Sequence, residues 1–192
     1  TDSFALDIPD SWIWTNLQHV GELARGKSKH SPRDDARLFG VDYPFIQTVD
    51  VALAKDYITN HSKNYSEFGL AQSRLFPTGT LCITIAANIG DTGILSYPCC
   101  FPDSVVGFIP KDDLIISEMS MYWLQFVQSD LEAFAPATAQ KNINLEILEA
   151  LPLPLPPLEE QREIVRQVKK HFAKQDAILD RIGVALRMIQ RS

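Results

Sequence analysis

The sequence has few cysteines and no long apolar run. Its three cysteines are Cys82, Cys99 and Cys100. An odd number of cysteines, two of them adjacent, does not suit a disulfide framework, and their spacing does not suit a metal site. We therefore expect these thiols to be small apolar residues in the strands of a reduced, cytoplasmic protein. No segment approaches the roughly 20 consecutive apolar residues of a membrane helix, so we expect no membrane partner.

The motifs of several enzyme classes are also absent. There is no Gly-x-x-x-x-Gly-Lys-Ser/Thr phosphate loop, no His-Glu-x-x-His zinc motif and no Asn/Asp-Pro-Pro-Tyr/Phe element of the amino-methyltransferases. After Pro102 and Asp103, no lysine stands two positions beyond an acidic residue, as a PD-(D/E)xK nuclease requires. The histidines lack the spacing of paired metal ligands; they are His19, His30, His61 and His171. We therefore predict that the chain is not an enzyme and holds no catalytic residue, no metal and no cofactor of its own.

Basic residues are too few to give a positive net charge. The 18 Lys and Arg residues face 24 Asp and Glu residues, which gives a formal charge of −6. Residues 75–157 carry nine acidic and two basic residues, whereas residues 25–74 carry eight basic and six acidic ones, and residues 158–192 carry eight and five. Since phosphate contacts supply most nonspecific affinity for DNA, we expect that affinity to be weak. A DNA-binding function therefore requires a local basic face or a partner that supplies one.

Short apolar runs, turns and one helical pattern alternate through residues 1–151. Trp12 and Trp14 are two residues apart, so they share one face of a predicted strand, and together with Trp123 they are expected in the core. Apolar spacing by three and four predicts an amphipathic helix over residues 116–134, and residues 25–37 are expected to form a loop. Further strands are predicted at residues 44–49, 81–85, 94–95 and 105–109, with a turn at 88–93 that makes a hairpin. The mixture predicts an α+β globular domain.

A proline-rich stretch separates this domain from a long helical pattern. Residues 152–157 contain four prolines and predict an extended, rigid connector. Residues 158–192 contain no proline and predict a coiled-coil-forming helix about 50 Å long at roughly 1.5 Å per residue. Its apolar stripe requires a partner helix. The residues predicted to pair with that helix are Val165, Val168, Phe172, Leu179, Ile182, Leu186 and Ile189, with Gln175 as a polar member of the same seam.

Several phrases of the sequence occur in the order known from one protein family. Residues 8–14, IPDSWIW, match a Leu-Pro-x-Gly-Trp-x-Trp opening. Residues 77–84 and 88–90 match a Pro-x-Gly-Thr/Asp-Leu-Leu-Ile-Ser strand and an Ile-Gly turn. The most specific phrase is PLPPLEEQREIV at residues 154–165, which matches Pro-Leu-Pro-Pro-Leu-x-Glu-Gln-x-x-Ile-Val. Along most of its length, the chain resembles the specificity subunit of type I restriction–modification enzymes, with one target-recognition domain and its spacer helix.

The resemblance implies a division of labour. In that family, two recognition domains each read one half of an interrupted DNA target, and two antiparallel helices separate these domains and dock the methyltransferase subunits. A separate restriction subunit uses ATP to translocate DNA and cut it. The implied partners are therefore double-stranded DNA, methyltransferase subunits and, indirectly, the restriction subunit, and S-adenosylmethionine and ATP with Mg belong to those partner subunits. With one domain and one helix, the chain is expected to pair with a second recognition domain or with a copy of itself.

The chain departs from the family pattern in two places. Many members have Asn-Gln-Gly-Phe where residues 103–108 are DSVVGF, and Gly-Thr-Thr/Ser-Gln where residues 136–142 are PATAQKN. Contacts that the missing polar side chains make in other members are therefore not carried over to this chain.

Three polar segments have side chains suited to base edges or phosphates. The segment 25–37 is basic, the segment 59–74 combines amides, cations and an aromatic ring, and the segment 138–142 is short and polar. A solvated loop is the alternative for the first segment, and capping of the next turn is the alternative for the third. The candidate DNA-binding residues are Lys27, Lys29, Arg33, Asn60, Lys63, Asn64, Tyr65, Gln72, Arg74, Thr138, Gln140 and Lys141.

Two other functions remain open at this point. The first is the recognition domain of a single-chain type II restriction–methyltransferase, which would read DNA by similar contacts and whose catalytic domains would lie outside this sequence. A coiled-coil adaptor that binds protein through its acidic body is the alternative from a different class. The ordered match from Trp12 to Val165 opposes the adaptor.

Overall fold

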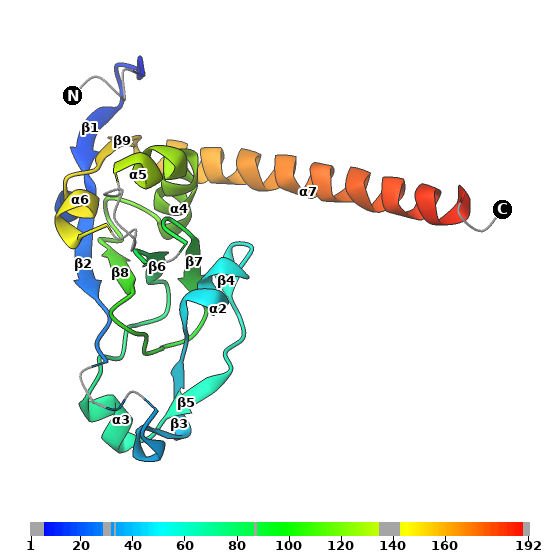
Figure 1. The fold of residues 1–192 in the computed structure, drawn as a ribbon. Coiled ribbons are helices and arrows are strands. Elements are labelled where there is room, and N and C mark those ends of the chain that lie inside the picture. The colour runs from blue at the N-terminus through cyan, green and yellow to red at the C-terminus, as the bar shows by residue number, and fades with distance from the viewer. Residues whose placement is uncertain (1–5, 29–31, 33, 87, 135–142, 190–192) are drawn as a thin grey trace.

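A five-stranded sheet forms the centre of the chain (Figure 1). The computed structural model describes residues 6–28, 32, 34–86, 88–134 and 143–189. The strand order is β2-β8-β6-β7-β4, and neighbouring strands are antiparallel except for the parallel pair β4 and β7. The strands are β2 Gly21–Arg25, β4 Tyr57–Ile58, β6 Leu81–Thr84, β7 Thr92–Leu95 and β8 Val105–Pro110.

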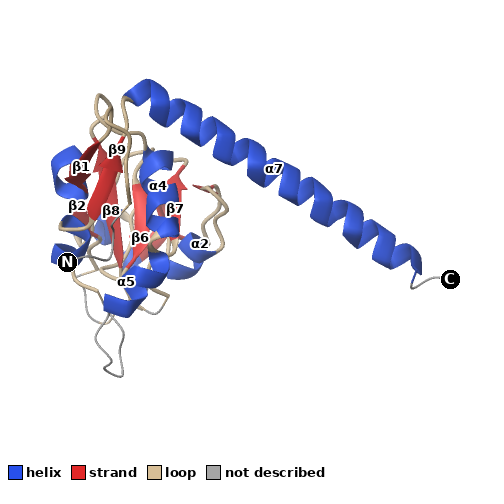
Figure 2. Cartoon of the chain, turned by 90° about the horizontal axis from the view of Figure 1, so that it is seen from above, coloured by secondary structure: helices blue, strands red, loops and turns tan. Residues whose placement is uncertain are grey.

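Both faces of this sheet are covered. Side chains alternate between the two faces of a strand, so Leu81 and Ile83 of β6 pack in one apolar cluster and Cys82 packs in another. The first cluster includes residues of α4 Ser117–Phe126, and both α4 and α5 Gln128–Phe134 lie against the sheet (Figure 2). The second cluster includes Val51 of α2 Thr48–Ala52. The strands β6 and β7 are buried throughout, which explains why apolar residues predominate in both.

A smaller unit lies at the end of the body farthest from the C-terminal helix (Figure 1). It comprises a 3-10 turn Ala36–Leu38, β3 Phe39–Phe45, β5 Lys63–Tyr65 and α3 Glu67–Ala71, and β3 pairs with β5 in an antiparallel ribbon. A two-stranded ribbon needs its own apolar contacts, and here Leu38, Phe45, Tyr65 and Cys100 form a small core. We call this unit the distal lobe.

A second two-stranded sheet joins the two ends of the body. Strand β1 Ile13–Asn16 pairs in antiparallel register with β9 Pro152–Leu155, and α1 Leu17–Val20 and α6 Leu145–Glu149 flank this sheet. The predicted connector 152–157 is therefore extended, but its first four residues form a strand of the body. Prolines are tolerated in such a strand because it lies at a sheet edge, where the ladder lacks a second neighbour. The body, residues 6–157, is called the head below.

Helix α7 Leu158–Ile189 begins directly after the prolines and projects from the head (Figures 1 and 2). Its 32 residues span about 48 Å. Val165 is buried with the head core, whereas all residues from Lys170 to Ile182 are exposed. The predicted rod is thus present, and its first turns are part of the head. Within the described residues, no helix is apolar enough over a sufficient length to cross a membrane.

Three sequence predictions of local structure are confirmed. The hairpin of β6 and β7 has the expected antiparallel register, with Gly90 at φ 85° in the turn, a conformation that favours glycine. The strand predicted at residues 105–109 is β8. The cysteines are free and buried as predicted, but only Cys82 lies in a strand, whereas Cys99 and Cys100 form isolated bridges. Burial raises the pKa of the Cys99 thiol to about 12.

Other predictions of local structure are wrong. The strand predicted at residues 44–49 ends at Phe45, and Thr48–Ala52 is helical because the Asp50 carboxylate accepts a hydrogen bond from the Gln47 backbone N–H at 2.7 Å and caps that turn. The single helix predicted over 116–134 is two helices, since the backbone leaves helical geometry at Val127.

The tryptophans share the core only in part. Trp123 is buried, whereas Trp14 is 40% exposed and contacts Trp123 edge to face, with ring centroids 6.1 Å apart. Trp12 precedes β1, so the pair does not occupy one strand as predicted. The Trp12 indole instead donates to the Glu160 carboxylate at 2.7 Å, which ties the N-terminal segment to the start of α7.

Candidate nucleic-acid interface

The distal lobe brings parts of two predicted DNA-binding segments together. Lys63 opens β5 and pairs with Phe45 of β3. Its ammonium lies 5.2 Å from the centroid of the Phe39 ring, a cation–π distance. Lys63 is exposed, so the aromatic ring holds the charge in place while solvent still reaches it.

The loop after β2 is held against the same region. The Gly26 backbone N–H donates to the Val105 carbonyl at 2.9 Å, and a Cβ added at Gly26 would lie 2.3 Å from the carbonyl oxygens of Phe101 and Pro102. Only glycine allows so close an approach of two backbones. Lys27, the next residue, is exposed, and it therefore projects from an anchored turn.

A groove lies beside Lys63 and Ser28, the residue that follows Lys27 in this anchored turn. Its cavity volume is about 200 Å³, and hydroxyl, amide and ammonium groups share its walls with aromatic rings. Polar side chains on a fixed backbone are what base edges and phosphates require. The lining residues are Ser28, Phe39, Phe45, Gln47, Thr48, Lys63, Tyr65, Pro102 and Ser104.

Tyr65 corrects one site prediction. Its side chain is 3% exposed and stacks on Phe45, with ring centroids 4.2 Å apart. The aromatic ring predicted to face DNA is therefore a core residue of the distal lobe. It supports the wall of the groove and the ribbon of β3 and β5, in which β5 carries Lys63.

Asn64 is held by a histidine in the same lobe. The ring nitrogens of His61 lie 3.0 Å from Asn64 Oδ1 and 2.9 Å from the Tyr97 hydroxyl. Burial raises the pKa of Tyr97 to about 12, so this hydroxyl stays protonated at neutral pH. The network fixes the Asn64 side-chain oxygen, which leaves less of the amide for base contacts than the sequence predicts.

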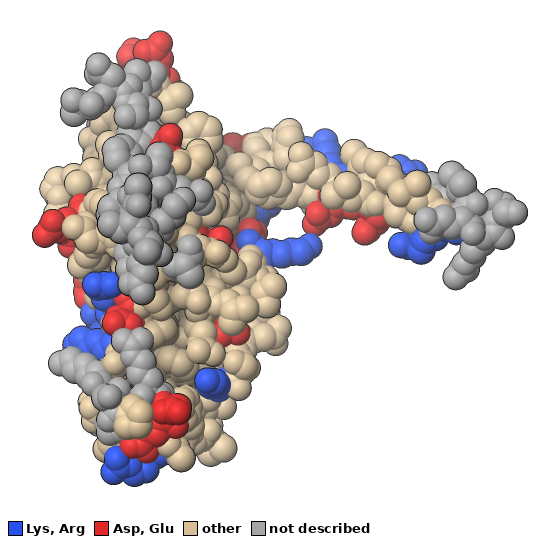
Figure 3. Space-filling model, viewed as in Figure 1, with Lys and Arg blue, Asp and Glu red and all other residues tan. Residues whose placement is uncertain are grey.

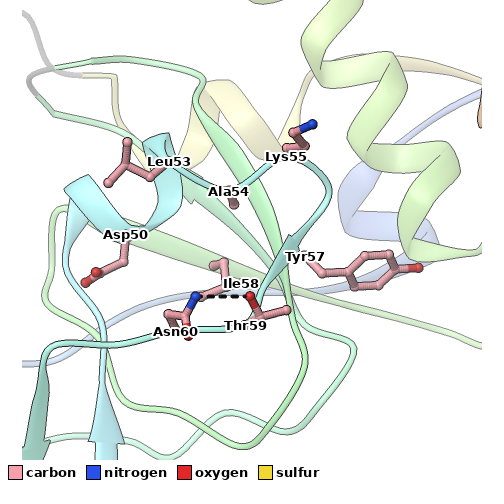
Figure 4. A pocket seen from close by; sticks show the side chains of 8 residues that line it. All are labelled: Asp50, Leu53, Ala54, Lys55, Tyr57, Ile58, Thr59 and Asn60. Carbon is pink, nitrogen blue, oxygen red and sulfur yellow. Dashed lines mark hydrogen bonds between the residues drawn. The ribbon is translucent and has the colours of Figure 1, made fainter. Parts of the chain in front are cut away.

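Asn60 lies at a separate pocket between the end of α2 and β4, with a volume of about 300 Å³ (Figure 4). Its side chain donates to the neighbouring Thr59 hydroxyl at 3.5 Å, and both residues are exposed. Lys55 and Asp50 line the same pocket, so it presents opposite charges. The structure therefore does not bring Asn60 into the groove with Lys63.

Arg74 and Gln72 also lie outside that groove. The Arg74 guanidinium pairs with Glu22 of β2 at 2.8 Å and stacks over Phe76, with 4.6 Å from Cζ to the ring centroid. Gln72 ends α3 as its C-cap residue. The predicted residues Lys29, Arg33, Thr138, Gln140 and Lys141 lie outside the described residues.

On the face of the head seen in Figure 3, side chains of both charges lie interspersed. In this view, Lys and Arg side chains form small groups at the lower part of the head and along α7, with Asp and Glu between them. Within the described residues, no group of three or more His, Cys, Asp or Glu side chains is arranged to hold a metal.

The seam predicted along α7 divides into two parts. Val165 is buried against the head and Val168 is half-buried, so Val165 is unavailable to a partner helix, contrary to the prediction. The outer seam is free of the head core, with Leu179 64% exposed and Ile182 50% exposed. Phe172 and Leu186 are exposed as well, and the side chain of Ile189 lies outside the described residues.

One buried polar residue escaped prediction. Gln161 is completely buried and accepts a hydrogen bond from the Ile116 backbone N–H, while its amide donates to the Leu114 and Pro156 carbonyls. The only sign of it in the sequence was its place in the family phrase at residues 154–165. The apolar periodicity puts this glutamine on a helix but does not show that its face of the helix is buried against the head.

Comparison with known proteins identifies the family. The family model of the type I restriction modification DNA specificity domain matches residues 9–186. The EcoDI specificity subunit of Escherichia coli is 42% identical over 186 residues, which cover 93% of this chain and 39% of that protein. The MjaIX specificity subunit of Methanocaldococcus jannaschii is 26% identical over 190 residues, which cover 93% and 43%.

Solved structures show the same fold. The HsdS subunit from Thermoanaerobacter tengcongensis superposes with a TM-score of 0.71 at 24% identity, over 93% of this chain and 41% of that one. The S subunit from M. genitalium gives a TM-score of 0.61 at 14% identity, over 90% and 42%. The chain thus spans about two fifths of the length of these relatives. It belongs to the family of type I restriction–modification DNA specificity domains.

Proposed function

We propose that the chain reads one half of a bipartite target in double-stranded DNA and performs no chemistry itself. The groove beside Lys63 supports this role, because it combines an exposed cation with polar side chains, and the turn that carries Lys27 is anchored next to it. The observation that carries the proposal is that the basic segments 25–37 and 59–74 meet at one groove of the head. The membership of the chain in the specificity-domain family supports the same function. The adaptor alternative leaves the groove without a role.

The helix completes the proposal. Its outer part exposes Leu179, Ile182 and Leu186 in one stripe, which favours an antiparallel partner helix from a second recognition domain or from a second copy. The paired helices then space two heads apart and dock the methyltransferase subunits. The restriction subunit joins indirectly, and S-adenosylmethionine and ATP with Mg are bound by these partners.

The acidic head fits such an assembly. Nine acidic and two basic residues in the segment 75–157 make the isolated chain a poor nonspecific DNA binder. Partner subunits are then expected to supply most phosphate contacts, while the distal lobe supplies sequence discrimination. Weak binding by the isolated chain and strong binding by the complex are therefore both expected.

A footprint of the assembled methyltransferase tests the proposal. The complete complex should protect both halves of an interrupted site, and a complex assembled without this chain should lose the protection of the half that the chain reads. Equal protection of both halves without the chain would contradict the proposal. A scrambled half-site of the same length controls for nonspecific coverage.

A further inference from the structure

The first contact that fixes α7 to the head is a buried glutamine. Gln161 lies in the first turn of the helix, and its side chain bonds to the backbone at three places: the Ile116 N–H at 3.1 Å and the Leu114 and Pro156 carbonyls at 2.8 Å. Leu114 and Ile116 lie just before α4, and Pro156 follows β9. This side chain therefore joins the helix to two separate segments of the head.

The second contact is an ion pair two turns farther along. The Lys169 ammonium lies 3.0 Å from the Glu118 carboxylate and 3.4 Å from the Tyr57 hydroxyl, and that hydroxyl donates to Glu118 at 2.5 Å. Burial opposes ionisation of Glu118, but the hydrogen bonds from Tyr57 and Lys169 outweigh it and lower the pKa of this carboxyl. Helix α7, helix α4 and strand β4 thus meet at one charged group.

Weaker contacts continue along the same face of the helix. Phe172 meets Tyr122 edge to face, with ring centroids 6.0 Å apart, and Asp176 lies 3.4 Å from the Lys55 ammonium. Together with Gln161, Val165 and Lys169, these two residues of α7 form one face toward the head, spaced by three and four, as one side of a helix requires. They cover about 22 Å at roughly 1.5 Å per residue.

The pairing seam occupies a different side of the helix. At about 100° per residue, the face centred on Leu179 and Ile182 is turned by roughly 70° from the face that meets the head. The head can therefore hold α7 while the seam stays open to a partner. Phe172 lies between the two faces.

We infer that Gln161 and Lys169 are positioning residues that set the angle between the recognition head and α7, and through it the separation of the two half-sites. This inference rests on the proposed function. A change of about 10° in that angle moves the far end of a 48 Å rod by about 8 Å, which exceeds two base pairs at about 3.4 Å each. A spacer rod can measure DNA only if this joint is stiff.

Distance measurements between spin labels test the joint directly. Labels at Val41→Cys in the distal lobe and Arg181→Cys on the helix are suitable, because Val41 and Arg181 are exposed and the native cysteines are buried. The wild-type background should give one narrow distance distribution. The double variant Glu118→Gln with Lys169→Met should give a broader or displaced distribution, and an unchanged distribution would overturn the inference.

Two further variants sharpen this result. Lys170→Met removes the exposed neighbouring lysine and should leave the distribution unchanged, which controls for the loss of charge. Gln161→Met keeps the side-chain length but removes three hydrogen bonds. It should broaden the distance distribution more than the double variant Glu118→Gln with Lys169→Met does. If Gln161→Met does not fold, the double variant Glu118→Gln with Lys169→Met still shows whether these contacts fix the angle of the helix.

Methylation of targets with altered spacers tests the functional part. The assembled methyltransferase should prefer one spacer length, and Glu118→Gln with Lys169→Met should reduce the preference over a spacer one base pair longer by about tenfold, while half-site sequence preference stays the same. Unchanged spacer preference together with a broadened joint would overturn the inference. If the wild-type complex shows no spacer preference at all, the proposed function itself fails, and the label distances still report on the joint.

Discussion

The two parts of α7 belong to one continuous helix but have opposite surroundings. Its inner part, residues 158–169, packs against the head through Val165 and bonds to it through Gln161. Its outer part, residues 170–189, contacts the head through the Phe172 ring and the Asp176 carboxylate, and it exposes Leu179 and Ile182 to solvent. The comparison shows that the head completes its own core, whereas the outer helix needs apolar contacts that this chain does not supply.

The largest effect should come from placing a charge in the inner part. Val165→Asp buries a carboxylate in the core of the head, which should cost about 3–5 kcal/mol of unfolding free energy. Leu179→Asp changes an exposed position, and there the same substitution should cost less than about 0.5 kcal/mol. Urea denaturation of the isolated chain compares them. An equal loss of unfolding free energy in Val165→Asp and Leu179→Asp would contradict the assignment of a buried inner part and an exposed outer part.

The next effect concerns pairing of the outer part. Ile182→Lys removes a buried aliphatic contact from the expected helix pair, worth about 1.5–3 kcal/mol, or roughly 10- to 150-fold in the dissociation constant. Asp180→Lys lies on the opposite side of the helix and is the matched control. Sedimentation of the chain with its partner helix measures both variants. Similar affinity for Ile182→Lys and Asp180→Lys would contradict the assigned seam.

A smaller effect is expected when the head meets DNA. Lys63→Ala in the assembled complex should weaken binding to the cognate site by about 1 kcal/mol, with a salt slope reduced by about 1 if the contact is to a phosphate. Adding Arg74→Ala should change little more, because Glu22 and Phe76 already engage that guanidinium. Lys174→Ala, on the outer helix, is the control for charge. Unchanged DNA affinity in Lys63→Ala would remove the groove from the interface.

The smallest effect is a pH dependence of the inner helix. Hydrogen bonds from Arg166 and then Gln167 lower the pKa of Glu163 from 4.5 to about 2. A lowered pKa in the folded state favours folding above the unfolded value and loses that contribution as the pH falls from about 4.5 toward 2. Wild type should therefore lose helix stability over this range relative to Glu163→Gln. Because the pair of Glu163 and Arg166 is exposed, solvent screening keeps the difference small. Circular dichroism of both proteins from about pH 5 to about pH 2 measures it, and identical pH profiles would contradict the prediction.

Features with strong local patterns were predictable from the sequence. The helix after residue 157 follows from the absence of proline and the apolar spacing, and the hairpin around Gly90 follows from a turn between two apolar runs. Features that depend on distant contacts were not. The segment at Thr48 has the composition of a strand but is capped as a helix, and the proline stretch at 152–155 becomes a strand because β1 lies beside it.

The candidate site was predictable only in part for the same reason. Composition identified Lys63 and Lys27, but it could not show that Tyr65 faces inward, because the stacking partner Phe45 comes from another strand. Glu22 is far from Arg74 in sequence, so their ion pair could not be predicted from the sequence either. Gln161 was missed because two of its three backbone hydrogen-bond partners, Leu114 and Ile116, lie about 45 residues earlier in the chain.

Mapping of methylated bases across the genome tests the central claim most directly. Cells that carry the complete restriction–modification system should show one interrupted methylation motif, and cells whose system lacks this chain should lose methylation at that motif. Substitution of Lys63 and Gln47 together should change base preference in one half of the motif and leave the other half intact. An identical motif with and without the chain would show that the head does not read DNA.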